Sequence, residues 1–274
     1  MASVTARISQ INQPRGGYIK PTDLKEIPLK DGNELGEENV HASITGMVVD
    51  YLTRYMVGKK NGLGDKKNVS EAFQISIMGY ALRSELLGKK AVLQDQKNKV
   101  DIKYLLNRID GLSDDSIIAA CKMTTYDVWF RNPMAAAMSK GPEETNPDKT
   151  TINNIRIMVE RSLKFWELYG PVVIDGFTFE EDGYTKTVDS GDGDYLTKDT
   201  MWDFKVSKSK PTNKHTLQLL MYWIMGQHSK KPEFKNITKL GIFNPRLNVV
   251  YTYNVNNVSE ETIREIEEEV ICYK

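Results

Sequence analysis

The stretch that decides the fold is SGDGDYLTKDTMWDFKVSKSKPTNKHTLQLLMYWIMG, residues 190–226. Its first half holds Asp194 at the start of one strand and a β-prone run over residues 201–206, with Lys198-Asp199 between them, and we interpret residues 194–205 as a hairpin. Its second half has apolar residues at helical spacing, which predicts a helix over roughly residues 213–227. A hairpin followed by a helix is a building unit of mixed α/β or α+β sheets.

The predicted hairpin would bring two acids and a lysine together. Residues two apart on a strand face the same side, so Asp203 and Lys205 project together, while Trp202 and Phe204 point to the opposite face and can be buried. In a hairpin Asp194 lies across from Asp203. Two carboxylates at one point attract a divalent cation, and oxygen ligands suit Mg²⁺ or Mn²⁺. A neighbouring ammonium can orient a water or stabilise charge that develops on a phosphate.

Each feature has a simpler interpretation when it is taken alone. An Asp-x-Lys pair on a strand is more often part of a solvated surface, and Gly-Asp-Gly-Asp is usually a turn. Gln218 and Tyr222, on the predicted helix, are most simply its polar margin. The joint spacing of all three features favours a functional site.

That joint spacing resembles the catalytic core of the PD-(D/E)xK nuclease superfamily, and most of all its RecB-type exonuclease branch. The branch shows G-x-x-D, then D-x-K, then Q-x-x-x-Y. These are matched here by Gly191 and Asp194, by Asp203 and Lys205, and by Gln218 and Tyr222. The resemblance is confined to this segment and fits residues 238–274 only loosely.

The resemblance implies a metal-dependent DNA nuclease, expected to be an exonuclease, that hydrolyses phosphodiester bonds with a metal-activated water. One or two Mg²⁺ or Mn²⁺ ions would be its cofactors. It implies catalytic roles for Asp194, Asp203, Lys205, Gln218 and Tyr222, and metal ligation by Asp194, Asp203 and the backbone carbonyl of Phe204.

Members of the RecB-like branch often carry a further metal ligand, a histidine on an N-terminal helix. His41 is the candidate here, because it precedes a predicted helix and shares the stripe of Ile44 and Val48, so we expect it to face inward. A helix-start histidine that bonds a backbone group is an equally good interpretation. The alternative ligands are Glu37, Glu38 and Glu160.

Lysines follow the second strand of the hairpin, at Lys208, Lys210 and Lys214, and we predict that they contact the DNA backbone. Solvated surface lysines are the simpler alternative. The expected partners are linear duplex or single-stranded DNA, together with a helicase or recombination protein in DNA repair.

Two other functions stay open. One is a non-catalytic nucleic-acid-binding or interaction module that keeps the nuclease fold. The other is a restriction-type endonuclease in which residues 58–150 supply sequence recognition. The intact set of Asp194, Asp203 and Lys205 favours an active nuclease, since a degenerate member would often have lost one of them.

Composition narrows the class of protein. The formal net charge is zero, with 37 basic and 37 acidic residues, which argues against a histone-like protein whose whole surface is basic. Two cysteines do not make a disulfide framework, and their sparsity fits a reducing cytoplasm. The N-terminus has no apolar signal region, and the longest apolar stretch is far shorter than a bilayer span. We therefore expect a cytoplasmic protein without a membrane partner.

The predicted fold class is α/β (α+β), with a restriction-endonuclease-like mixed sheet core flanked by helices and an N-terminal helical subdomain. Residues 1–274 are expected to form a single nuclease-like domain, in which residues 58–150 are a helical subdomain or insertion and residues 151–274 are the catalytic core. Prolines and glycines predict that residues 1–36 are irregular, and residues 89–103 are predicted to be a polar connection.

Overall fold

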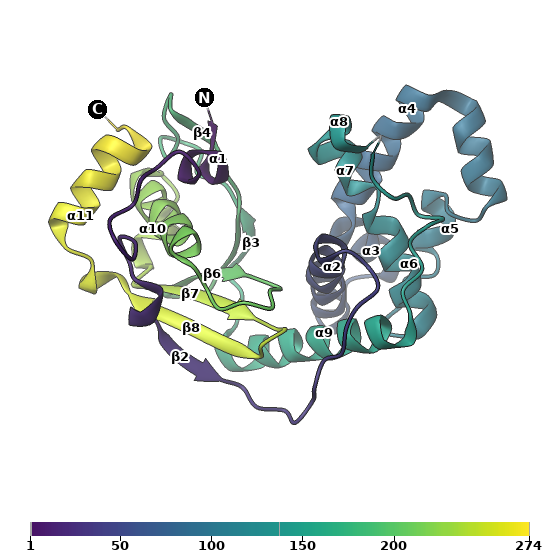
Figure 1. The fold of residues 1–274 in the computed structure, drawn as a ribbon, viewed down its shortest axis with the longest axis horizontal. Coiled ribbons are helices and arrows are strands. Elements are labelled where there is room, and N and C mark those ends of the chain that lie inside the picture. The colour runs from purple at the N-terminus through teal and green to yellow at the C-terminus, as the bar shows by residue number, and fades with distance from the viewer. Residues whose placement is uncertain (1, 137, 274) are drawn as a thin grey trace. The chain divides into compact units, whose positions relative to one another are not determined.

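A computed structural model describes residues 2–136 and 138–273 of the chain (Figure 1). The described residues divide into two compact units. The sheet unit comprises residues 2–31 and 165–273, and the helical unit comprises residues 32–164. The helical unit thus begins earlier and ends later than the subdomain predicted over residues 58–150.

A six-stranded sheet forms the centre of the sheet unit. Its strands lie in the order β2-β8-β7-β6-β5-β3. Strands β6 and β7 are parallel and the other neighbours are antiparallel, so the predicted mixed sheet is confirmed. The strands are β2 (Lys25–Pro28), β3 (Ile174–Phe177), β5 (Gly193–Leu196), β6 (Thr200–Phe204), β7 (Lys239–Asn244) and β8 (Val249–Asn254). A separate parallel pair joins β1 (Ala2–Ser3) to β4 (Val188–Ser190).

One face of the sheet packs against helix α10 (Asn213–His228), where the sequence predicted a helix (Figure 1). Leu217, Leu220 and Met221 of α10 are buried in one core with Leu196 of β5 and Met201 of β6. The same core includes α1 (Val4–Ile8) and the C-terminal segment, which runs from α11 (Glu260–Glu265) into a π-helix (Ile266–Ile271). Short 3-10 turns cover Pro21–Asp23, Pro232–Asn236 and Val255–Asn257.

The opposite face of the sheet is covered by aromatic side chains. Phe165 comes from the end of helix α9 (Lys149–Tyr169) and is fully buried among Tyr195, Trp202 and Phe243. Its ring stacks on that of Phe243, with 4.3 Å between the centroids. Phe204 packs against the same cluster. The predicted alternation along β6 is therefore confirmed, because Trp202 and Phe204 share the face away from Asp203.

The aromatic cluster predicts a large effect for one truncation. Phe165→Ala removes a fully buried ring and leaves a cavity, which should lower the free energy of unfolding of the chain by about 3–5 kcal/mol. Leu168→Ala is the matched control on the same helix, because its side chain is 56% exposed and should change stability by less than about 0.5 kcal/mol. Urea unfolding measures both. Equal shifts in the two midpoints would contradict the packing described for Phe165.

The helical unit is built from helices that pack around an apolar core. Buried members of this core include Leu52, Tyr55, Phe73, Ile117 and Ile155. The helices are α2 (Ala42–Lys60), α3 (Asp65–Ala72), α4 (Gln74–Lys97), α5 (Ile102–Leu106), α6 (Asp114–Thr124), α7 (Asp127–Arg131), α8 (Pro133–Ala136) and the part of α9 up to residue 164.

A buried carboxylate links three of these helices. Asp127 of α7 is 1% exposed and accepts hydrogen bonds of 2.5 Å from the hydroxyls of Tyr51 on α2 and Ser76 on α4. Burial raises the pKa of Asp127, and the two hydroxyl donors oppose that rise. Each oxygen of the Asp127 carboxylate thus accepts a hydrogen bond. Because the buried group is satisfied within the helical unit, we interpret this network as structural.

Two local predictions were wrong. Residues 89–103 were expected to be a polar connection, but α4 continues to Lys97 after a break at Gly88, whose φ of 74° redirects the chain. This part of α4 is largely exposed, and even Leu93 is 65% exposed. A helix that buries little surface has only a weak apolar stripe, so its sequence did not indicate a helix. Residues 1–36 were expected to be irregular, yet residues 25–28 form β2 at the sheet edge.

Within the described part of the chain, no helix is long and apolar enough to cross a membrane.

Candidate functional site

The site lies where the β5–β6 hairpin opens at one end. Tyr195 pairs with Trp202 and Leu196 with Met201, and continuing this antiparallel register by one residue sets Asp194 opposite Asp203. The backbone N–H of Phe204 donates to Oδ2 of Asp194 at 2.7 Å. The Asp194 side chain is therefore held against the backbone that carries Asp203.

Asp203 and Lys205 form an ion pair on the face of the sheet that α10 covers. The ammonium of Lys205 donates to Oδ1 of Asp203 at 2.9 Å, and the Asp203 side chain is 5% exposed. Burial alone would lower the pKa of Lys205, but Asp203 and Asp194 attract the ammonium more strongly and the pKa is raised. Lys205 therefore carries its positive charge at neutral pH and interacts electrostatically with both acids.

The second oxygen of Asp203 has no partner among the described residues. Oδ2 is buried and accepts no hydrogen bond. A buried ionised oxygen without a donor is costly, and native proteins normally satisfy such atoms. A cation placed between Asp203 and Asp194 would satisfy this oxygen, and the donor set of carboxylate oxygens suits Mg²⁺ or Mn²⁺.

The protein ligands available to such an ion are few. Among residues 2–136 and 138–273, no group of three or more His, Cys, Asp and Glu side chains is placed to hold a metal ion. The ligand set would be Asp194, Asp203 and the backbone carbonyl of Phe204. Mg²⁺ commonly binds through one or two carboxylates and keeps several waters, so two acids are a suitable number.

Helix α10 presents polar side chains towards these acids. The Gln218 amide donates to the hydroxyl of Tyr222 at 3.0 Å, and Tyr222 is buried. Burial raises the pKa of Tyr222, as do Asp203, Asp192 and Asp194, which places this hydroxyl in the field of the acids. His215 closes a capping box at the start of α10, and burial and the Lys205 ammonium lower its pKa. Tyr222 and His215 thus interact electrostatically with the charged groups of the site, and Gln218 is connected to it through its hydrogen bond to Tyr222.

Asp192 was not among the residues predicted for the site. This exposed acid lies two residues before Asp194 and contributes to the negative field at Lys205 and Tyr222. Its position in Gly-Asp-Gly-Asp was the available signal.

Both flanking glycines are required by close packing. A Cβ at Gly191 would lie 2.8 Å from Cγ2 of Val4, and the ring of Phe177 occupies the place of a Cβ at Gly193. The Tyr184 hydroxyl also donates to the Gly191 carbonyl at 2.6 Å, which fixes this turn. The turn that carries Asp192 is therefore held in place from three sides.

His41 and its alternatives belong to the helical unit. His41 is exposed, not inward-facing as predicted, because it is the N-cap of α2: its Nδ1 accepts from the backbone N–H of Ser43. Glu38 accepts from the amide of Asn154 at 2.8 Å. Glu37 and Glu160 lie in the same unit. Metal ligation by His41 stays a prediction.

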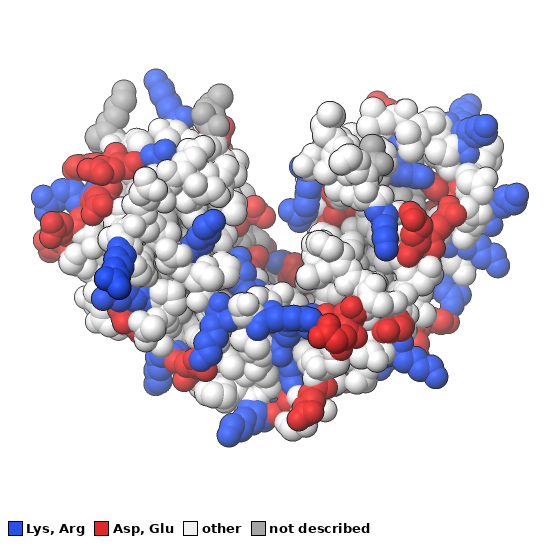
Figure 2. Space-filling model, viewed as in Figure 1, with Lys and Arg blue, Asp and Glu red and all other residues white. Residues whose placement is uncertain are grey.

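The three lysines predicted to bind DNA lie around the loop between β6 and α10. Lys210 pairs with Glu26 at 2.7 Å and keeps a side chain that is 69% exposed, and Lys214 is exposed as well. Lys208 lies in the same loop. Figure 2 shows basic and acidic side chains interspersed on the viewed face of the sheet unit, without one continuous basic patch.

Comparison with known proteins adds no relative. No family model matches the chain, and neither a curated protein nor a solved structure matches it.

Proposed function

We propose that the protein is a metal-dependent DNA nuclease. The observation that carries the proposal is the buried, unpartnered Oδ2 of Asp203, on a strand that faces Asp194 and beside the ammonium of Lys205. Two acids in register with a charged lysine form a set that can hold a cation and stabilise an attacked phosphodiester. The resemblance of the segment to RecB-type exonucleases supports the same function.

The roles of the residues follow from their contacts. Asp194 and Asp203, with the carbonyl of Phe204, would hold Mg²⁺ or Mn²⁺, which when bound would supply an acidified water and positive charge at the phosphate. Lys205 stays protonated, so it can donate hydrogen bonds where negative charge develops during attack. The ion pair with Asp203 orients the Lys205 ammonium before substrate arrives.

Gln218 and Tyr222 have a supporting role in this proposal. Since Tyr222 accepts a hydrogen bond from Gln218 and its pKa is raised, its own O–H remains a donor at neutral pH. That donor can bond a carboxylate of the site or a phosphate oxygen of DNA. Lys208, Lys210 and Lys214 would add salt-dependent affinity for the DNA backbone.

The direct test is incubation of the chain with linear and covalently closed circular DNA. We expect Mg²⁺ or Mn²⁺ to support degradation of linear DNA while circular DNA persists, and EDTA to stop the reaction. Cleavage of circular DNA would instead make the protein an endonuclease. If neither DNA is cut with either metal, although DNA is bound, the proposal is wrong and the non-catalytic binding module takes its place.

A further inference from the structure

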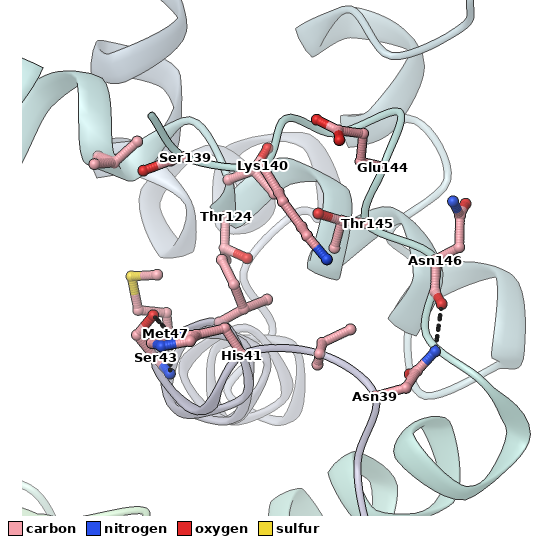
Figure 3. A pocket seen from close by; sticks show the side chains of 14 residues that line it. Asn39, His41, Ser43, Met47, Thr124, Ser139, Lys140, Glu144, Thr145 and Asn146 are labelled. Atoms are coloured by element: carbon pink, nitrogen blue, oxygen red, sulfur yellow. Dashed lines mark hydrogen bonds between the residues drawn. The ribbon is translucent and has the colours of Figure 1, made fainter. Parts of the chain in front are cut away.

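The helical unit contains a cavity that the proposed nuclease site does not use. Its volume is about 690 Å³, which is the size of pockets that hold small organic ligands. The walls come from the start of α2, the end of α6, Val128 of α7 and the loop over residues 139–146 (Figure 3). All of these segments lie within the helical unit.

Hydroxyl groups in the wall present acceptors to this cavity. Four hydroxyls each donate a hydrogen bond to a backbone carbonyl at 2.7–3.1 Å. Their oxygens can therefore only accept hydrogen bonds from a ligand. They belong to Thr124, Thr125, Ser139 and Thr145. A ligand that carries several N–H or O–H groups fits such a wall.

One cation in the wall is not neutralised. Among the described residues, none forms an ion pair or a hydrogen bond with the ammonium of Lys140, and Figure 3 shows this side chain reaching from its loop into the cavity. By contrast, the amide of Asn39 is used within the wall, where it donates to the carbonyl of Asn146 at 2.9 Å. Lys140 is therefore free to meet an anionic group of a ligand.

A second donor comes from His41. Its Nδ1 accepts from the backbone N–H of Ser43, so the hydrogen of the neutral ring lies on Nε2. Ile44, Met47 and Val128 supply the apolar part of the wall. The cavity thus combines one cation, one ring donor, several acceptors and an apolar surface.

We propose that this cavity binds a nucleoside monophosphate. The phosphate would lie on Lys140 with His41 as a second donor, and the base would pack against Ile44 and Val128. Sugar hydroxyls and a base amino group would donate to the wall hydroxyls. A single phosphate is favoured because one unpaired cation lines the cavity and the carboxylate of Glu144 lines it too. The inference goes beyond the nuclease and does not depend on it.

Isothermal titration of the full chain with deoxyadenosine monophosphate in EDTA tests the proposal. EDTA excludes binding through a metal at Asp194 and Asp203, so failure of the nuclease proposal would leave this result unaffected. We expect saturable binding, weakened at least about tenfold in Lys140→Ala because a charge-assisted hydrogen bond is lost. Lys103→Ala, an exposed lysine of the same unit that does not line the cavity, should bind like wild type.

Two fragments of the nucleotide complete the test. Inorganic phosphate and deoxyadenosine should each bind at least about tenfold more weakly than the monophosphate, because each makes only part of the contacts. Phosphate binding as tight as that of the nucleotide would overturn the nucleotide assignment. Absence of saturable binding, or unchanged affinity in a folded Lys140→Ala variant, would overturn the proposal altogether.

Discussion

Replacing Lys205 with alanine should slow DNA cleavage by at least about a hundredfold, the usual effect of removing one preorganised donor from a transition state. The carboxylates would still hold the cation, so Mn²⁺ binding should remain. DNA affinity should also remain, because in the proposed function it would be distributed over many lysines. The Lys205 ammonium lies 2.9 Å from Oδ1 of Asp203, and in the proposed reaction it would act mainly on charge that develops during attack.

Single-turnover cleavage, Mn²⁺ titration and a DNA-binding assay separate these effects. Lys198→Ala is the matched control, since Lys198 is an exposed lysine in the turn of the same hairpin. Its cleavage rate should equal that of wild type. If the Lys205→Ala variant cuts DNA as fast as wild type, the catalytic role proposed for this lysine is wrong. If it loses Mn²⁺ as well, Lys205 acts through the structure of the metal site instead.

Replacing Asp203 with asparagine should abolish both metal binding and DNA cleavage. Wild type should gain thermal stability with Mn²⁺, because a ligand that binds only the folded state stabilises it by mass action, by about 2.7 kcal/mol at a concentration of one hundred times Kd. Asparagine removes the negative charge and replaces one carboxylate oxygen with an NH₂ group. This group is a hydrogen-bond donor and would face either the cation or the Lys205 ammonium. The buried Oδ2 that a cation would satisfy is then lost.

Melting temperatures with and without Mn²⁺ measure this prediction. Asp189→Asn is the control, because Asp189 is an exposed acid that lies only five residues before Asp194. That variant should keep the stabilisation by Mn²⁺ and the cleavage activity. An unchanged melting temperature of wild type on addition of Mn²⁺ would contradict a preformed cation site. Stabilisation that persists in Asp203→Asn would place the cation elsewhere.

Local sequence was sufficient for the elements that bear the site. The alternation of Trp202, Asp203 and Phe204 predicted which side chains are buried in the aromatic cluster, because side-chain direction on a strand has a period of two. The helical spacing of apolar residues likewise predicted α10. These signals act over a few residues, so they can be read without knowledge of the rest of the chain.

The tertiary structure alone decided the features that depend on distant contacts. Strand β2 exists because Lys25 pairs with Thr252 and Ile27 with Val250, more than two hundred residues away, and its own four residues carry no strong strand pattern.

The unpartnered oxygen of Asp203 was likewise invisible in the sequence, because the lack of a partner depends on every group packed around it. The cavity beside Lys140 also required the structure, since its walls come from segments up to about a hundred residues apart. Sequence periodicity determined which faces the side chains of β6 and α10 take, and three-dimensional packing determined which of those side chains were left without a partner.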